Sequence, residues 1–170
     1  MFEKGTKAHL IGIKGVGMTA LAQIMQARGV QVTGSDNSAK FFTDAVLKRL
    51  NIPYAEKFDV KNISDDTDIV VVSGAYMHEG RALNNVEVEE AFVKKIPVML
   101  YSQALGEIAK EYQVLAVAGS NGKSTTTALL GWVLEQAGAD PTVVVGTKVN
   151  KWESNARAGD LSLYHSSAEL

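Results

Sequence analysis

Short apolar runs alternate along this chain with longer segments whose apolar residues recur at helical spacing. The runs are rich in aliphatic residues, which is typical of buried strands, and they lie at 9–13, 30–33, 69–72 and 98–100. The helical spacing predicts helices from the glycines at 15–17 to about residue 28, and at 43–50, 85–94 and 102–110. Ser102 is the expected cap of the last helix. The alternation predicts an α/β fold with a parallel sheet covered by helices.

The pattern starts again after residue 110. Val114–Ala118 reads as a strand, and Thr125–Gln136 reads as a helix with Trp132 in a core and Gly138 after its end. Further strands are expected at 142–145 and 161–165. A nucleotide-binding sheet of this type usually has about five strands, so three would leave the sheet half covered. We therefore expect a domain at 1–110 and a truncated second domain at 111–170, whose open sheet a second copy of the chain would cover.

The start of the predicted 125–136 helix carries a phosphate-binding motif. The residues are Gly119, Ser120, Asn121, Gly122, Lys123, Ser124 and Thr125. Glycines let successive N–H groups point at phosphate oxygens, and the helix N-terminus adds a positive dipole. Lys123 would neutralise the β- and γ-phosphates, and the Ser124 hydroxyl would bind Mg²⁺. The motif is tighter than the standard phosphate loop, but its context favours an ATP site.

A second, different glycine motif follows the first predicted strand. Gly15-Val16-Gly17-Met18-Thr19-Ala20 fits G-x-G-x-x-A at the start of a helix, and Asp36 follows about twenty residues later. In a dinucleotide fold, that acid binds a ribose. This arrangement predicts a Rossmann-like nucleotide site, to which Ser73-Gly74-Ala75, at the carboxyl end of another strand, would contribute.

Composition limits the possible partners. The 170 residues are 46% hydrophobic and carry a formal charge of −2, which favours neither nucleic acid nor an anionic membrane as a partner. There is no cysteine, no run of about twenty apolar residues and no secretory signal, so we expect a cytoplasmic protein. His9, His78 and His165 share no metal-ligand spacing, and the Glu87-Glu89-Glu90 cluster is expected to be solvated.

The order of the motifs resembles the opening of the Mur ligases. The resemblance runs from HLIGIKGVGMTALAQIM through VVVSGAY and AVAGSNGKSTTTALL to NARAGD, and covers nearly all of the chain. It implies an N-terminal UDP-substrate domain followed by the start of a central ATPase domain. The implied enzyme of peptidoglycan synthesis uses ATP and Mg²⁺ to join L-alanine to UDP-N-acetylmuramate through an acyl phosphate. Family members are much longer, so this chain is expected to be an inactive fragment.

The resemblance also assigns residues. UDP-N-acetylmuramate would be bound by Gly15, Val16, Gly17, Met18, Ser35, Asp36, Ser73, Gly74 and Ala75. Lys123 would be catalytic, and Glu169 would join Ser124 as a magnesium ligand, although Ser166-Ser167-Ala168 departs from the acidic family pattern.

Other departures leave the added amino acid open. Asn121 and Ser124 replace the His and Thr usual in the alanine-adding members, and Asn is more typical of ligases that add later amino acids and of folylpolyglutamate synthetases. Lys14 replaces a common glycine, where it would contact phosphate or point to water. Two other functions stay open from the residues: an NAD(P)-dependent oxidoreductase, and a non-catalytic protein that binds a UDP-sugar.

Overall fold

A parallel sheet organises the first part of the chain. The computed structural model describes residues 1–78, 81–82 and 84–160. The sheet has the order β3-β2-β1-β4-β7, and every neighbouring pair of strands is parallel. Its strands are β1 Lys7–Ile11, β2 Gln31–Ser35, β3 Tyr54–Ala55, β4 Ile69–Val72 and β7 Val98–Leu100. The predicted α/β fold is confirmed, and only the two-residue β3 was missed in this sheet.

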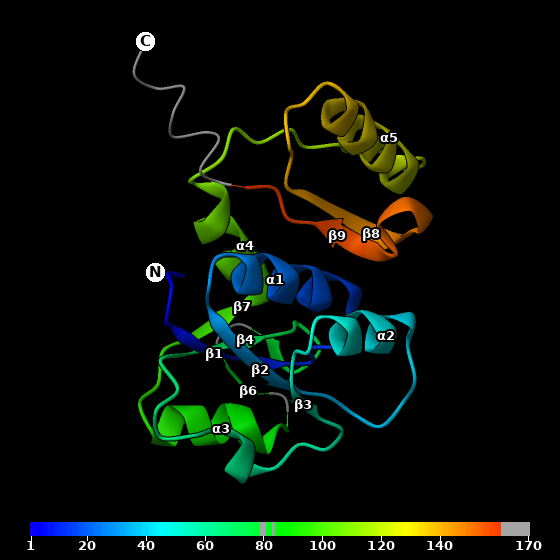
Figure 1. The fold of residues 1–170 in the computed structure, drawn as a ribbon. Helices are drawn as coiled ribbons and strands as arrows, with labels where there is room; N and C mark the ends of the chain where they lie inside the picture. Colours follow the sequence, from blue (N-terminus) through cyan, green and yellow to red (C-terminus); the bar gives the residue numbers. More distant parts are fainter. Residues whose placement is uncertain (79–80, 83, 161–170) are drawn as a thin grey trace.

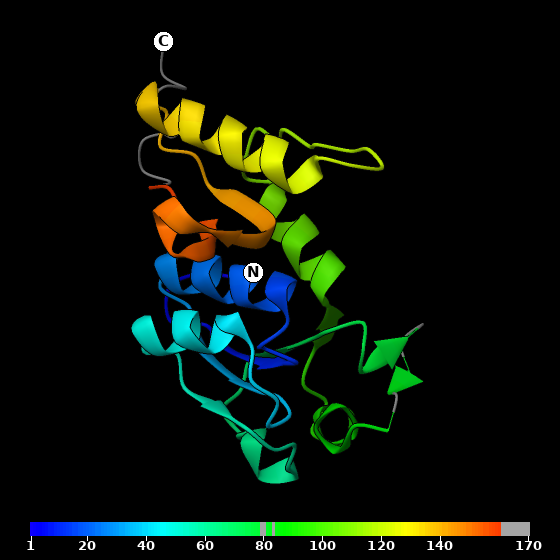
Figure 2. The ribbon, with the colours of Figure 1, turned by 90° about the vertical axis from the view of Figure 1, so that its right-hand side faces the viewer.

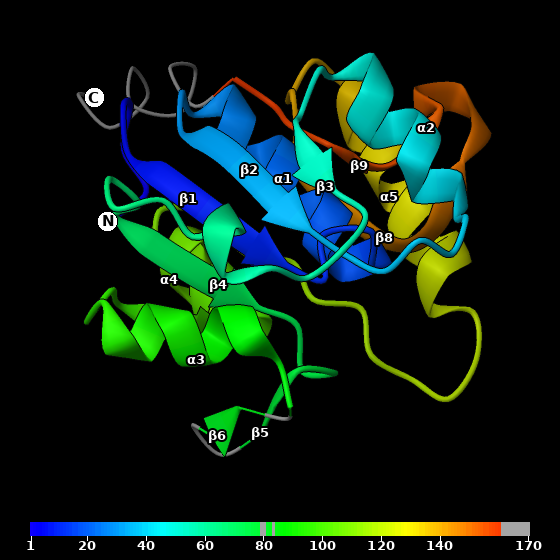
Figure 3. The same cartoon turned by 90° about the horizontal axis from the view of Figure 1, so that it is seen from below.

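Helices cover both faces of the sheet (Figures 1 and 3). The helices on one face are α1 Val16–Ala27, α2 Phe42–Arg49 and α4 Tyr101–Ala109. The opposite face is covered by α3 Val86–Val93, beside the short 3-10 helix η1 Val60–Asn62. A small antiparallel pair, β5 Met77–His78 and β6 Arg81–Ala82, extends from the end of β4. No helix within the described residues is long and apolar enough to cross a membrane.

The core follows from the two-residue period of the central strands. Leu10 and Val71 point toward α1, whereas Ile11 and Val70 point toward α3, and all four are fully buried. Strands buried on both faces read as continuous apolar runs, which explains why β4 was predicted at its observed bounds.

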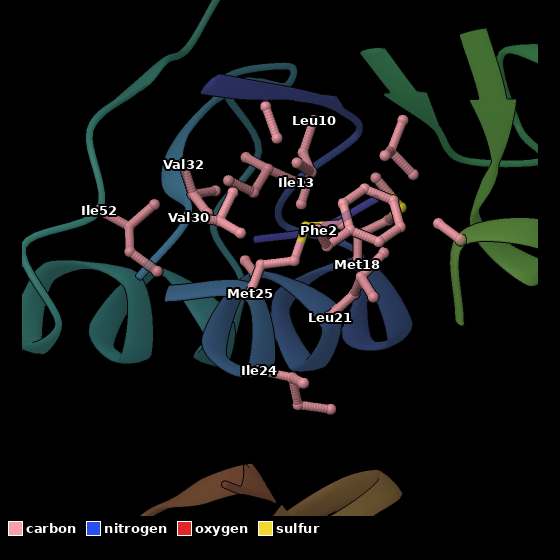
Figure 4. Packing of buried hydrophobic residues seen from close by; sticks show 14 of the residues in the cluster. Phe2, Leu10, Ile13, Met18, Leu21, Ile24, Met25, Val30, Val32 and Ile52 are labelled. Atoms are coloured by element: carbon pink, nitrogen blue, oxygen red, sulfur yellow. The ribbon is translucent and has the colours of Figure 1, made fainter. Parts of the chain in front are cut away.

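Helix α1 is buried on two sides (Figure 4). Met18, Leu21 and Met25 pack toward the sheet, while Ile24 points the opposite way and is only 2% exposed. The helix ends where Gly29 takes a φ of +81°, as the sequence predicted.

The second part of the chain packs on the outer side of α1 (Figures 1 and 2). It consists of α5 Lys123–Gln136, β8 Val143–Val149, the 3-10 helix η2 Asn150–Trp152 and β9 Ser154–Arg157. The β8–β9 pair is an antiparallel hairpin that lies between α1 and α5. The molecule is therefore layered as sheet, α1, hairpin and α5.

Three local expectations were wrong. Val114–Ala118 forms no strand, and Leu115 is 62% exposed, because the described chain offers it no neighbouring strand. Trp132 is 45% exposed rather than in a core, since within the described residues α5 packs mainly on the hairpin, through β8. Ser102 lies inside α4, and the Gln103 side chain accepts from Leu100 N at 2.8 Å instead. The strand expected at 161–165 lies outside the described residues.

Candidate nucleotide-binding sites

The first glycine motif lies at the carboxyl edge of the sheet, between β1 and α1. β1 and β4 lie side by side there, and their connections leave on opposite faces, which creates the crevice where open α/β sheets bind ligands. Thr19 N donates the first helical hydrogen bond, to Gly15 O at 2.8 Å. The amides of Val16, Gly17 and Met18 precede it in the first turn of α1, where backbone donors have no partner within the helix. Gly15 is exposed, so this turn can accept an anion.

Close packing explains two of the glycines around this loop. Gly12 has a φ of +84°, and a Cβ there would lie 2.8 Å from Ser73 Cβ, so the turn at 73–75 sits directly against the loop. A Cβ on Gly17 would lie 2.8 Å from the Tyr101 ring of α4. The structure therefore brings together the predicted substrate residues Gly15 to Met18 and Ser73 to Ala75. Gly74 and Ala75 are exposed at this edge.

Ser35 and Asp36, at the end of β2, turn their side chains into the protein. Asp36 is 4% exposed, and its carboxylate accepts from Lys14 N and Asn37 N, both at 2.8 Å. Ser35 is fully buried and its hydroxyl donates to Glu87. Both side chains thus hold the loops around the crevice in place from inside the protein. Only the backbone of these two residues is left to face the crevice.

Glu87 is the centre of a buried polar network that the sequence did not reveal. It is fully buried at the start of α3, so the expectation of a solvated acidic face was wrong for this residue. Its carboxylate accepts from Asn62 Nδ2 at 2.6 Å and from Asp59 N at 3.1 Å, in addition to Ser35. The His9 ring lies 3.7 Å away and also contacts Ser35. The network ties β1, β2, η1 and α3 together below the crevice.

This network predicts an acid-sensitive stability. Burial opposes ionisation of Glu87, but hydrogen bonds from His9, Ser35 and Asn62 outweigh it and lower the pKa of the carboxyl below its usual value. A lowered folded-state pKa stabilises the fold above the unfolded value of 4.5 and loses that contribution as pH falls below it. In urea unfolding, wild type should lose more stability than Glu87→Gln between pH 6 and about pH 3.5. Exposed Glu89→Gln is the control, and parallel profiles for wild type and Glu87→Gln would contradict the prediction.

Lys14 belongs to the first loop, yet its side chain is 0% exposed. Its ammonium donates to Ala39 O at 2.7 Å and lies 3.2 Å from Glu56 and 3.5 Å from Asp44. The sequence predicted that this side chain would contact phosphate or point to water. Both expectations were wrong, because the ammonium is buried among groups of the protein. This buried ion cluster could not be predicted from the sequence, because nothing in the sequence shows that positions 14, 44 and 56 meet.

The second glycine motif lies at the N-terminus of α5. Gly122 precedes the helix with a φ of +75°, and Gly119 has a φ of +151°, so both positions need glycine. Lys123 Nζ donates to Gly119 O at 2.8 Å and to Ser120 O at 3.2 Å, which folds the cation over its own loop. Ser124 is half-buried beside Gly146 of β8.

These residues fit a nucleoside triphosphate. A glycine-rich turn leads into a 14-residue helix, and one lysine and one hydroxyl occupy the positions that such loops use for phosphate and Mg²⁺. Among the described residues, no group of three acidic, histidine or cysteine side chains could hold a metal ion. Glu169, the second expected magnesium ligand, lies outside the described residues.

The hairpin connects the two loops. Asn155 of β9 is fully buried and donates from Nδ2 to Val16 O at 2.5 Å, in the first turn of α1. Gln23 of α1 donates to Asn155 Oδ1 at 3.3 Å and accepts from Ser154 Oγ at 2.6 Å. At its other end, the hairpin lies against Ser124 through Gly146.

Asn155→Ala should weaken the contact between the hairpin and α1. The change removes two buried side-chain hydrogen bonds, the one to Val16 O and the one from Gln23, so we expect a loss of about 2 kcal/mol in the free energy of unfolding. Urea unfolding followed by circular dichroism measures the loss. Exposed Asn150, in η2 of the same hairpin, is the control, and Asn150→Ala should change stability by no more than about 0.5 kcal/mol. Equal stabilities of the two variants would contradict a structural role for Asn155.

Comparisons with known proteins agree with this geometry. The family model described as "Mur ligase family, catalytic domain" matches residues 7–113, more than half of the chain. A UDP-N-acetylmuramate–L-alanine ligase from Treponema pallidum is 41% identical over 86% of this chain and 30% of its own length. One from Desulfitobacterium hafniense is 45% identical over 89% of this chain and 32% of its own length. The chain thus spans about a third of the length of these relatives.

Solved structures show the same likeness. The crystal structure of the UDP-N-acetylmuramate–alanine ligase from Thermotoga maritima is 29% identical, with a TM-score of 0.79 over 90% of this chain and 35% of that one. A UDP-N-acetylmuramate:L-alanyl-γ-D-glutamyl-meso-diaminopimelate ligase from Neisseria meningitides is 30% identical, with a TM-score of 0.77 over 90% of this chain and 46% of that one.

Proposed function

The chain belongs to the Mur ligase family, and on that premise we propose that it is the substrate-binding part of a peptidoglycan-precursor ligase. The parent enzyme would join L-alanine to UDP-N-acetylmuramate at the expense of ATP. The relatives named above carry that activity in their names, and they are about three times as long as this chain. We assign residues 1–110 to the UDP-substrate domain and 111–170 to an incomplete ATP-binding domain. A cytoplasmic location, a role in cell-wall growth and division, and self-association through the open second domain belong to the same proposal.

The first turn of α1 is the observation that carries the proposal. Its amides, the exposed Gly15 and the turn at 73–75 converge at the crevice, where backbone donors and the helix dipole would bind the diphosphate of UDP-N-acetylmuramate. The backbone at Ser35 and Asp36 would line the nucleoside. Because the Asp36 carboxylate is already engaged by two backbone amides, it does not present itself to a ribose as the acid of an NAD site would.

The second loop would supply the ATP site of the complete enzyme. Gly119 to Thr125 would surround the phosphates, Lys123 would release its loop carbonyls to meet them, and Ser124 would bind Mg²⁺. Bound ATP supplies the phosphoryl group that activates the substrate carboxylate for attack by an amine. The chain's own part is to hold the phosphates beside the hairpin that contacts the first loop. We propose that the described part alone binds the UDP-substrate but does not complete the ligation.

Thermal unfolding with separate ligands tests the proposal. A ligand that binds only the folded state raises the unfolding midpoint once its concentration exceeds its Kd. UDP-N-acetylmuramate at about 100 times its Kd should raise the midpoint by about 5 °C, and NAD should not change it. Mg·ATP reports on the second loop independently. A shift with NAD and none with UDP-N-acetylmuramate would overturn the proposal in favour of a nicotinamide-binding domain.

A further inference from the structure

The environment of Lys14 is unusual for a residue in a phosphate-binding loop. Its side chain is completely buried, and the ammonium lies 5.7 Å from the centre of the Tyr54 ring and 5.8 Å from that of Phe41. All of its hydrogen-bond and ionic partners come from the segments that follow β2 and β3. The charge is therefore enclosed by groups of the protein itself.

Lys14 connects the first loop to residues 36–44 at three levels. Its backbone N donates to Asp36 at 2.8 Å, and its backbone O accepts from Thr43 Oγ1 at 2.6 Å. Its ammonium then donates to Ala39 O, in the middle of the connection between β2 and α2. Residues 37–41, which flank the crevice, are largely exposed, so this lysine is a main restraint on where they lie.

Lys14 also compensates two carboxylates at the carboxyl edge of the sheet. Asp44 is in the first turn of α2, and Glu56 directly follows β3. Burial opposes ionisation of Asp44, but Phe41 N, the Tyr54 hydroxyl and Lys14 together lower its pKa; Lys40 and then Lys14 lower that of Glu56. Both carboxylates are therefore charged at neutral pH. Lys40 also pairs with Glu56, at 2.6 Å, so two cations balance two carboxylates here. Without Lys14, the edge that must attract a diphosphate would carry one net negative charge.

We propose that Lys14 is a positioning residue for the UDP-substrate, which fixes residues 36–41 against the diphosphate loop and, together with Lys40, neutralises Asp44 and Glu56 without touching the ligand. The inference rests on the proposed function, because it concerns affinity for that substrate. Lys14 would thus support substrate binding as a buried cation, and not through the contact with phosphate that its place in the sequence suggested.

Lys94 provides a matched control. It too donates to a backbone carbonyl, Ile63 O at 2.6 Å, and pairs with two carboxylates, Asp65 at 2.6 Å and Glu90 at 3.7 Å. It lies at the end of α3, on the face of the sheet opposite α1. A general effect of losing a buried or half-buried lysine should therefore appear in both Lys14→Met and Lys94→Met, whereas a positioning effect should appear only in the first.

Calorimetric titration of UDP-N-acetylmuramate into the 170-residue chain tests the inference. Lys14→Met should raise Kd at least about tenfold, and Lys94→Met should leave it within about twofold. Adding Glu56→Gln to Lys14→Met leaves Lys40 to balance Asp44, which restores the net charge of this edge and should recover most of the affinity. Uridine, which lacks phosphate, should also bind Lys14→Met more weakly, because the loop that lines the nucleoside has moved.

Several outcomes would overturn the inference. An unchanged Kd for Lys14→Met is one of them. Another is a loss of affinity that affects only phosphate-bearing ligands and that Glu56→Gln does not relieve, since that result means that Lys14 contacts phosphate directly. If circular dichroism shows Lys14→Met to be unfolded, Lys14→Arg decides. The larger guanidinium should displace residues 36–41 and weaken binding at least about fivefold, whereas a direct phosphate ligand would keep its affinity as arginine. Failure of wild type to bind UDP-N-acetylmuramate would instead reject the proposed function.

Discussion

Replacing Glu87 with alanine should lower the free energy of unfolding by about 3 kcal/mol, since it removes the acceptor of one buried hydroxyl and of two half-buried N–H groups. The Ser35 hydroxyl, Asn62 Nδ2 and Asp59 N all donate to this carboxylate, and Glu87 itself is fully buried. Each unsatisfied buried group costs about 1–3 kcal/mol. For a domain whose total stability is about 5–15 kcal/mol, this is a large fraction.

Urea unfolding of Glu87→Ala and Glu89→Ala measures the effect. The two residues share the first turn of α3, but Glu89 is exposed, so its removal should change stability by no more than about 0.5 kcal/mol. Glu87→Gln should fall between wild type and Glu87→Ala, because the amide oxygen keeps one acceptor. If Glu87→Ala unfolds at the same urea concentration as Glu89→Ala, the network does not stabilise the fold.

The sequence predicted those parts of the fold that local pattern determines. The apolar run at 69–72 became β4 at its exact bounds, and the glycines at 15–17 and 29 mark the ends of α1. These signals are local because a buried strand must be apolar on both faces and a helix terminus needs a particular backbone conformation. The positions of both glycine-rich loops, at the starts of α1 and α5, followed for the same reason.

The errors concern features that depend on distant neighbours. Val114–Ala118 has a strand-like sequence, but a parallel strand forms only beside another strand, and the described residues provide none there. Glu87 and Glu89 are alike in sequence, yet one faces the buried end of β2 and the other faces water. Helical spacing puts Glu87 on the side of α3 that also carries the buried Val88 and Ala91. The residue type gave no sign of this burial, because it depends on the polar partners that α3 meets where it docks.

The candidate site shows the same division. The backbone of the first loop could be predicted because glycine spacing reports the conformation that a phosphate requires. The roles of Asp36 and Lys14 could not, because each side chain turns inward to partners at other positions in the chain, Lys14 N for the first and Glu56 for the second. The motif therefore predicted the loop at which we propose that the ligand binds, while the side chains that hold this loop in shape were visible only in the fold.

Gly34→Ala should be as damaging as the loss of Glu87, for a steric reason. A Cβ at position 34 would lie 2.6 Å from Ile13 Cδ1 and 2.7 Å from Leu10 O, where strand β2 passes beside the loop between β1 and α1. The side chain could move, but the carbonyl belongs to the central strand and cannot shift without disturbing the sheet. Overpacking of this kind costs about 3 kcal/mol, and the displaced Ile13 would carry the loop with it.

Gly106→Ala is the matched control for this substitution. Gly106 is an exposed glycine inside α4 with no atom within 4 Å of an added Cβ, so alanine there should stabilise the chain by about 0.5–1 kcal/mol through helix propensity. Urea midpoints should therefore move in opposite directions for the two substitutions, and only Gly34→Ala should lose affinity for UDP-N-acetylmuramate. A Gly34→Ala variant with wild-type stability and affinity would mean that β2 and the loop are not in contact as the structure places them. Both substitutions add one methyl group. Changes in stability of opposite sign would therefore reflect the different surroundings of the two glycines.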